Sequence, residues 1–225
     1  MPLTRIRESA AIVCVGAFNP TIFHPAWFAA RNLIQKTEEE GAEIQVVNAN
    51  VAQFKMKWLQ MQVLRERLSA TAETPDNFPL LRDVVVGAFG LLEHTPVTAL
   101  GLNRHIHFEV HDAREWHHVG HVFAPKTIWR RYLKEPGLGV LSIKARRPDK
   151  RKGEINVQIN PPVFGQATPY VIEVLVNSHF DVGETPTAGA VAQLIAEEWG
   201  SVMEFAEKVA VGVVEDALRE KAPHE

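Results

Sequence analysis

Seven of the chain's ten histidines lie between residues 94 and 123. In a strand, His105 and His107 would project to one face, because alternate side chains of a strand share a face. His117 and His121 are four residues apart in a segment with helical features, which is the spacing of zinc-binding pairs on a helix. The four imidazoles could therefore form the metal site of a metal-dependent hydrolase.

Such a site requires the helix that follows the histidine strand to fold over the histidine face. Asp112, with Glu115 three residues later, has the capping-box spacing and predicts the start of this helix. If the helix instead covers Ile106 and Phe108, the strand histidines face away from it and form a polar surface. We expect the second arrangement, because the histidine spacing is easily matched by chance.

Other catalytic signatures are absent from the sequence. It contains no G-x-S-x-G motif, phosphate-binding loop or dinucleotide fingerprint. Its single cysteine, Cys14, lies in an apolar run and is expected to be a buried structural thiol. We therefore predict no cofactor and expect that the protein is not an enzyme.

Basic side chains crowd the tip of a predicted hairpin. They are Lys144, Arg146, Arg147, Lys150, Arg151 and Lys152. A nucleic-acid backbone would be attracted to such a projection. However, charged hairpin tips also protect sheet edges, and the net charge of -3 argues against an extended nucleic-acid surface. A nucleic-acid-binding module that uses residues 144–152 is an alternative function.

A third candidate surface carries large apolar side chains. Phe54, Met56 and Trp58 alternate with Lys55 and Lys57, which predicts a strand with one apolar face. If this face is open, it forms a protein-binding patch. We favour the alternative, in which the face packs under helices.

The elements of the first half follow from periodicity and helix breakers. Residues 10–18 predict a buried strand, and Pro25 predicts the start of a helix that Gly41 ends. Residues 42–74 predict two or three antiparallel strands, and residues 80–92 predict a helix. Within the strand region, residues 64–73 are either strand or helix, because their helix propensity competes with the period-two pattern.

The second half repeats this order. A strand is predicted over 97–110, and the helix after it continues past Pro125 as a second helical segment through the sequence IWRRYL. Three antiparallel strands are predicted over 139–147, 153–161 and 168–180. A long helix is predicted from Pro186.

The repeated order predicts an internal duplication, with one half over 1–94 and the other over 95–225. We expect an α+β fold in which two βαβββα repeats form a curved, mainly antiparallel sheet with helices packed on one face. This order resembles the tandem architecture of the TATA-box-binding protein, which leaves the other sheet face open.

The mid-chain sequence PVTALGLNRHIHFEV and the late strands resemble an uncharacterised, sporadically distributed prokaryotic protein family of similar length. This resemblance implies a bacterial, archaeal or phage origin and carries over no catalytic residue. An accessory role in a mobile-element or defence system would be consistent with it.

The bulk composition is that of a globular protein, with 46% hydrophobic and 23% charged residues among 225. The sequence has neither an apolar signal core nor an apolar run of membrane-spanning length, so we expect a cytoplasmic protein with no membrane partner. Taken together, we predict a non-enzymatic interaction or scaffold protein. It would bind a protein partner or itself, as a homo-oligomer, through a sheet face or edge.

Overall fold

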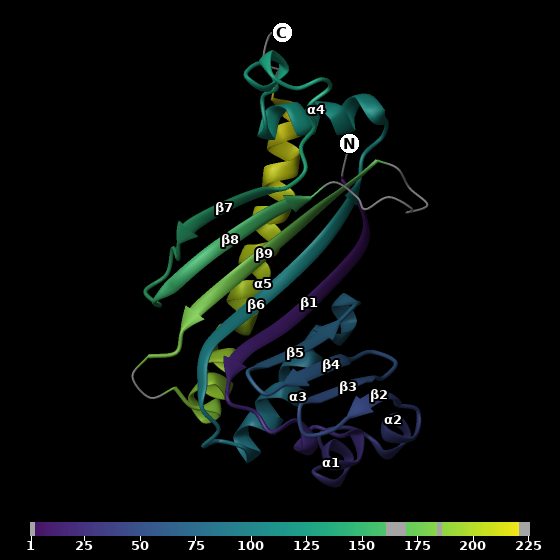
Figure 1. The fold of residues 1–225 in the computed structure, drawn as a ribbon, viewed down its shortest axis with the longest axis vertical. Coiled ribbons are helices and arrows are strands. Elements are labelled where there is room, and N and C mark those ends of the chain that lie inside the picture. Colours follow the sequence, from purple (N-terminus) through teal and green to yellow (C-terminus); the bar gives the residue numbers. More distant parts are fainter. Residues whose placement is uncertain (1–2, 161–169, 184–185, 221–225) are drawn as a thin grey trace.

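One large antiparallel sheet organises the chain (Figure 1). The computed structural model describes residues 3–160, 170–183 and 186–220. In that part of the chain, the strand order is β2-β3-β4-β5-β1-β6-β9-β8-β7. The elements are β1 (Thr4–Gly16), η1 (Pro20–Ile22), α1 (Pro25–Ala30), α2 (Lys36–Glu40), β2 (Glu43–Val47), β3 (Val51–Lys55), β4 (Gln60–Leu64), β5 (Arg67–Ala72), η2 (Pro75–Asn77), α3 (Phe78–Leu91), β6 (Val97–Glu109), α4 (Ala113–Phe123), η3 (Trp129–Arg131), β7 (Leu141–Arg146), β8 (Gly153–Asn160), β9 (Val171–Asp181) and α5 (Ala188–Arg219).

The longest strands pair at the centre of the sheet. β1 pairs with β5 on one side and with β6 on the other, and β6 also pairs with β9. Figure 1 shows α5 running behind the sheet, where it contacts β6 and β9. The 32-residue α5 is continuous through Gly200 and Gly212, because buried residues recur along its whole length on the side that packs on the sheet.

The apolar face of β6 contributes to two separate cores. Leu100 and Leu102 belong to the first, which lies under α1, α3 and the beginning of α5. Ile106 and Phe108 belong to the second, which lies under α4 and the end of α5. Arg104 lies on the same face between these residues, and it is itself buried. A charged side chain therefore divides the apolar interior.

Several predictions from the sequence are confirmed. The chain has an α+β fold with a large antiparallel sheet and helices. The predicted strand over 97–110, the three strands after it, and the helices near residue 80 and after Pro186 are all present. The ambiguous segment 64–73 is a strand over most of its length, β5. The region 42–74 holds four strands rather than two or three.

Two helix predictions are wrong. The helix expected from Pro25 to Gly41 is broken, since α1 ends at Ala30 and Asn32 has a φ of 55°. Asparagine tolerates this left-handed conformation better than most residues, and a helix cannot continue through it. The helical segment expected after Pro125 is only the single turn η3. Its side chains are exposed, so no tertiary packing sustains a longer helix there.

Candidate functional site

The two histidine pairs do not form one site. Val119 of α4 packs in the same core as Ile106 and Phe108, so this helix covers the apolar face of β6. His105 and His107 alternate with those residues and project to the other face. The expected packing of the helix is confirmed.

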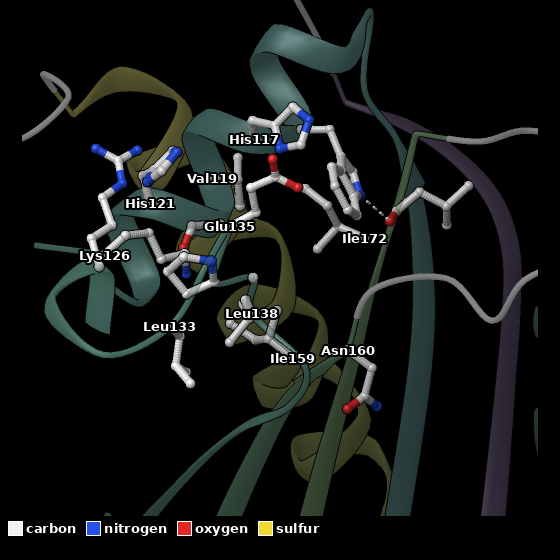
Figure 2. Close-up of a pocket in the computed structure, with 16 residues that line it drawn as sticks. His117, Val119, His121, Lys126, Leu133, Glu135, Leu138, Ile159, Asn160 and Ile172 are labelled. Atoms are coloured by element: carbon white, nitrogen blue, oxygen red, sulfur yellow. Dashed lines mark hydrogen bonds between the residues drawn. The ribbon is translucent and has the colours of Figure 1, made fainter. Parts of the chain in front are cut away.

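The metal-site hypothesis is therefore wrong. Its residues, His105 and His107 on β6 and His117 and His121 on α4, are divided between the two sides of the sheet. In the described ranges, no group of three or more His, Cys, Asp or Glu side chains could hold a metal ion. His117 and His121 instead line a cavity beside α4 (Figure 2).

The strand histidines interact with Glu173 on the polar face of the sheet. His105 Nδ1 lies 3.2 Å and His107 Nε2 lies 3.8 Å from Glu173 Oε1. The hydrogen bond from His105 lowers the pKa of Glu173 against an opposing effect of burial. Burial lowers the pKa of His107 and outweighs the attraction of Glu173. This cluster is a polar contact between β6 and β9.

Arg147 in the basic hairpin is bound within the chain. Its Nε and Nη2 donate to the two carboxylate oxygens of Asp149, at 3.1 and 2.5 Å. Its guanidinium also lies over the ring of Phe180, 3.7 Å from the ring centroid. The hydrogen bond from Arg147 lowers the pKa of Asp149. Because Arg147 is buried in these contacts, it is not available to a phosphate backbone.

Two more of the six hairpin cations are neutralised by carboxylates. Arg151 donates to Glu197 and Glu198 of α5, both at 2.7 Å. Lys144 donates to Glu154 at 3.1 Å. Within the described residues, only the remaining three, Arg146, Lys150 and Lys152, lack such a carboxylate. The expected array of six free cations is not present.

The apolar patch predicted on β3 is not exposed. Phe54 and Met56 are buried in the core beneath α1, and the Phe54 ring packs against Phe28. Trp58 is half-buried, and its indole N–H donates to Glu38 of α2. The alternative that this face packs under helices is confirmed, so these residues do not form a protein-binding patch.

A different apolar surface was missed by the sequence analysis. Six of the eleven large apolar residues exposed in the described part of the chain lie between residues 128 and 143. We call these six the β7 surface: Ile128, Trp129, Tyr132, Leu133, Val140 and Ile143. The apolar residues of IWRRYL are the available signal in the sequence, but the same residues also predict a helical segment.

One residue of the β7 surface, Ile143, lies in an edge strand of the sheet. β7 pairs with β8 on one side and ends the sheet on the other, in the part of the chain that the structure describes. Ile143 points to the same side of the sheet as the buried Ile155 of β8 but is 55% exposed. Trp129 and Tyr132 are 53% and 80% exposed.

Comparison with known proteins adds no functional residue. No family model matches this sequence, and no curated protein matches it. The resemblance to a prokaryotic family stays a prediction. Among the described helices, none combines the length and apolar character needed to cross a membrane.

Proposed function

We propose that the protein is a non-enzymatic scaffold that binds a second copy of itself through the edge strand β7 and the β7 surface. The observation that carries this proposal is an edge strand, unpaired on its outer side in the described residues, that bears the exposed Ile143 and follows five other exposed large apolar residues in the sequence. An unpaired strand edge is a template for strand addition, and exposed apolar clusters mark protein interfaces.

The sequence of β7 suits pairing with its own copy. Two antiparallel β7 strands related by a two-fold axis at Ile143 would place the two Ile143 side chains opposite each other. In that register Lys144 faces Ser142 of the second copy rather than another lysine. Two lysines directly opposite each other would destabilise the strand pair, and this register avoids that arrangement. Apolar side chains meet on one side of the joined sheet and polar ones on the other.

Size measurement tests this proposal directly. Sedimentation equilibrium or light scattering of the purified wild-type chain is expected to give a dimer, and Ile143→Lys is expected to give a monomer with an unchanged circular dichroism spectrum. Ile44→Lys is the matched control, since Ile44 is also exposed but lies on β2 at the opposite edge of the sheet. It is expected to leave the dimer intact.

Either of two results would overturn self-association through β7. One is a wild-type chain that is monomeric at high micromolar concentration. The other is a dimer that Ile143→Lys does not weaken.

The two alternative functions have less structural support. Nucleic-acid binding through residues 144–152 would rely on the hairpin cations, three of which are held by carboxylates of this chain. A metal-dependent hydrolase would need the histidine pairs to converge, and they lie on opposite sides of the sheet.

We also infer that the two halves of the chain, 1–94 and 95–225, are tandem repeats in a TATA-box-binding-protein-like arrangement. The strand order supports this inference, since β1 and β6 pair at the centre, β5 and β9 flank them, and β4 and β8 follow. Each half also ends in a helix that packs on the sheet, α3 or α5. Among the described residues of the second half, β2 has no counterpart. An experimental structure in which β1–α3 fails to superpose on β6–α5 would refute the duplication.

A further inference from the structure

A cavity of about 670 Å³ lies between α4, the segment 133–138 and the adjoining ends of β8 and β9. This volume falls within the range of small-molecule sites, about 300–1,000 Å³. Much of its wall is apolar, formed by Trp116, Val119, Leu138, Ile159 and Ile172. In Figure 2, Leu138 and Ile159 lie between Lys126 on one side and Asn160 on the other.

Lys126 lies at one end of this cavity, near His121 (Figure 2). Lys126 is buried, with only 6% of its surface exposed. Its Nζ donates to one backbone carbonyl, that of Gly120 in α4, at 3.1 Å. No carboxylate pairs with it anywhere in the described residues. Burial accordingly lowers the pKa of Lys126.

A buried ammonium group normally has an anionic partner or a full set of acceptors. An ammonium group has three N–H donors, and the Gly120 carbonyl accepts from one of them. Lys126 borders the cavity, whose lining includes the polar side chains His117, His121, Glu135 and Asn160 beside the apolar wall. The cavity therefore combines a largely apolar wall with a buried ammonium group at one end, and the exposed side chains of Arg130 and Glu135 also line it.

We propose that this cavity binds a small amphipathic carboxylate. The carboxylate accepts hydrogen bonds from Lys126 Nζ, and the apolar body of the ligand packs against Leu138, Ile159 and Ile172. A carboxylate would pair with the buried ammonium of Lys126, whereas the Arg130 and Glu135 side chains of the lining are exposed to solvent. The pairing with Lys126 favours a carboxylate over a neutral ligand of the same length. The apolar wall favours a hydrocarbon body over a hydrophilic anion such as acetate.

This site is distinct from the proposed dimer contact. β7 contributes no residue to the cavity lining, and of the six residues of the β7 surface only Leu133 reaches it. A monomeric protein could still bind the carboxylate, and a dimer could fail to bind it. The two proposals can therefore be refuted separately.

Calorimetric titration with octanoate and octan-1-ol tests the carboxylate site, because the two probes share a chain and differ in the charged head. Wild type is expected to bind octanoate at least about tenfold more tightly than octan-1-ol, since a charge-assisted hydrogen bond is lost with the alcohol. Lys126→Met is expected to remove this preference, because it keeps the apolar stem and deletes the ammonium. Lys134→Met is the matched control, since Lys134 is an exposed lysine of the same segment that does not line the cavity.

Three results would overturn the carboxylate site. Octanoate could give no saturable heat with wild type, octan-1-ol could bind as tightly as octanoate, or Lys126→Met could keep the preference. If the methionine variant does not fold, as judged by circular dichroism, the comparison of the two probes on wild type decides the proposal alone.

Discussion

Replacing Arg104 by methionine should destabilise the fold strongly, because this side chain bridges three elements. From the helix-covered face of β6, its guanidinium donates to Glu8 of β1 at 2.7 Å and to the Met203 carbonyl of α5 at 2.9 Å. It also lies 2.9 Å from Glu207 of α5. Arg104→Met keeps an unbranched apolar stem and removes all three contacts.

The magnitude follows from what remains around the two carboxylates. Removing one partner of a buried ion pair costs about 3–5 kcal/mol, because the other charge stays buried. Here the cost should lie at the low end, about 3 kcal/mol. Arg5 still contacts Glu8 at 3.2 Å and Glu207 at 2.6 Å, and the Glu207 side chain is 37% exposed. A melting temperature lower by about 9 °C is expected for a chain of this size.

Urea unfolding followed by circular dichroism measures this loss. Arg7→Met is the matched control, because Arg7 pairs with Glu73 at 2.9 Å where both side chains are more than half exposed. It should cost less than about 1 kcal/mol. Adding Glu8→Gln to Arg104→Met should recover part of the loss, with a coupling energy above about 1 kcal/mol. If Arg104→Met costs no more than the control, or if the double variant shows no coupling, the bridging argument is refuted.

Three further outcomes test other parts of the structure. The free energy of unfolding should fall on acidification, first below the ordinary pKa of histidine, because the lowered pKa of His107 favours the neutral imidazole in the fold. The free energy of unfolding should fall again below the ordinary carboxyl pKa, because the pKa of Glu173 is also lowered in the fold. Urea titrations from pH 7.5 to 4 that show rising stability would contradict both expected decreases. Gly153→Ala should cost at least about 2 kcal/mol in the same assay, because Gly153 has a φ of 135° and an added Cβ would lie 2.1 Å from the His179 carbonyl oxygen. Cys14 should not react with a thiol reagent until urea is added, since burial raises its pKa, and rapid labelling in buffer would show that β1 opens.

The strands were predictable where alternation is sustained over many residues. In β6, polar His105 and His107 alternate with Ile106 and Phe108, and this pattern defines both the strand and its two faces. The long helix was predictable because its apolar residues keep the helical period over 32 residues. In both elements the local pattern agrees with the tertiary packing.

The missed features depend on contacts that are distant in sequence. Phe54 lies in a strand as expected, but β3 ends at Lys55, so Met56 and Trp58 follow the strand, and the pattern does not show that Phe28 of α1 covers Phe54. Arg151 appeared to be a free hairpin cation, yet its carboxylate partners are 46 and 47 residues away in α5. The helix expected through Trp129 had apolar residues but no core to pack on, and propensity alone does not sustain a helix that short.

The two halves of the chain differ in how their first helix meets the sheet, and this difference explains where the candidate sites lie. In the first half, α1 brings Phe28 against Phe54 and Trp27 against Phe28, so aromatic rings fill the space between helix and sheet. In the second half, Val119 is the one residue of α4 that is buried, and the Trp116 indole N–H donates to the Val171 carbonyl at the end of β9. The helix is thus fixed to the sheet by few contacts, and a cavity is left beside it. After α4 the chain returns to the sheet along an exposed apolar segment. Both proposed binding surfaces therefore lie beside the sparsely packed α4, whereas the cavity beside α1 is lined by residues of α1, α2 and α3.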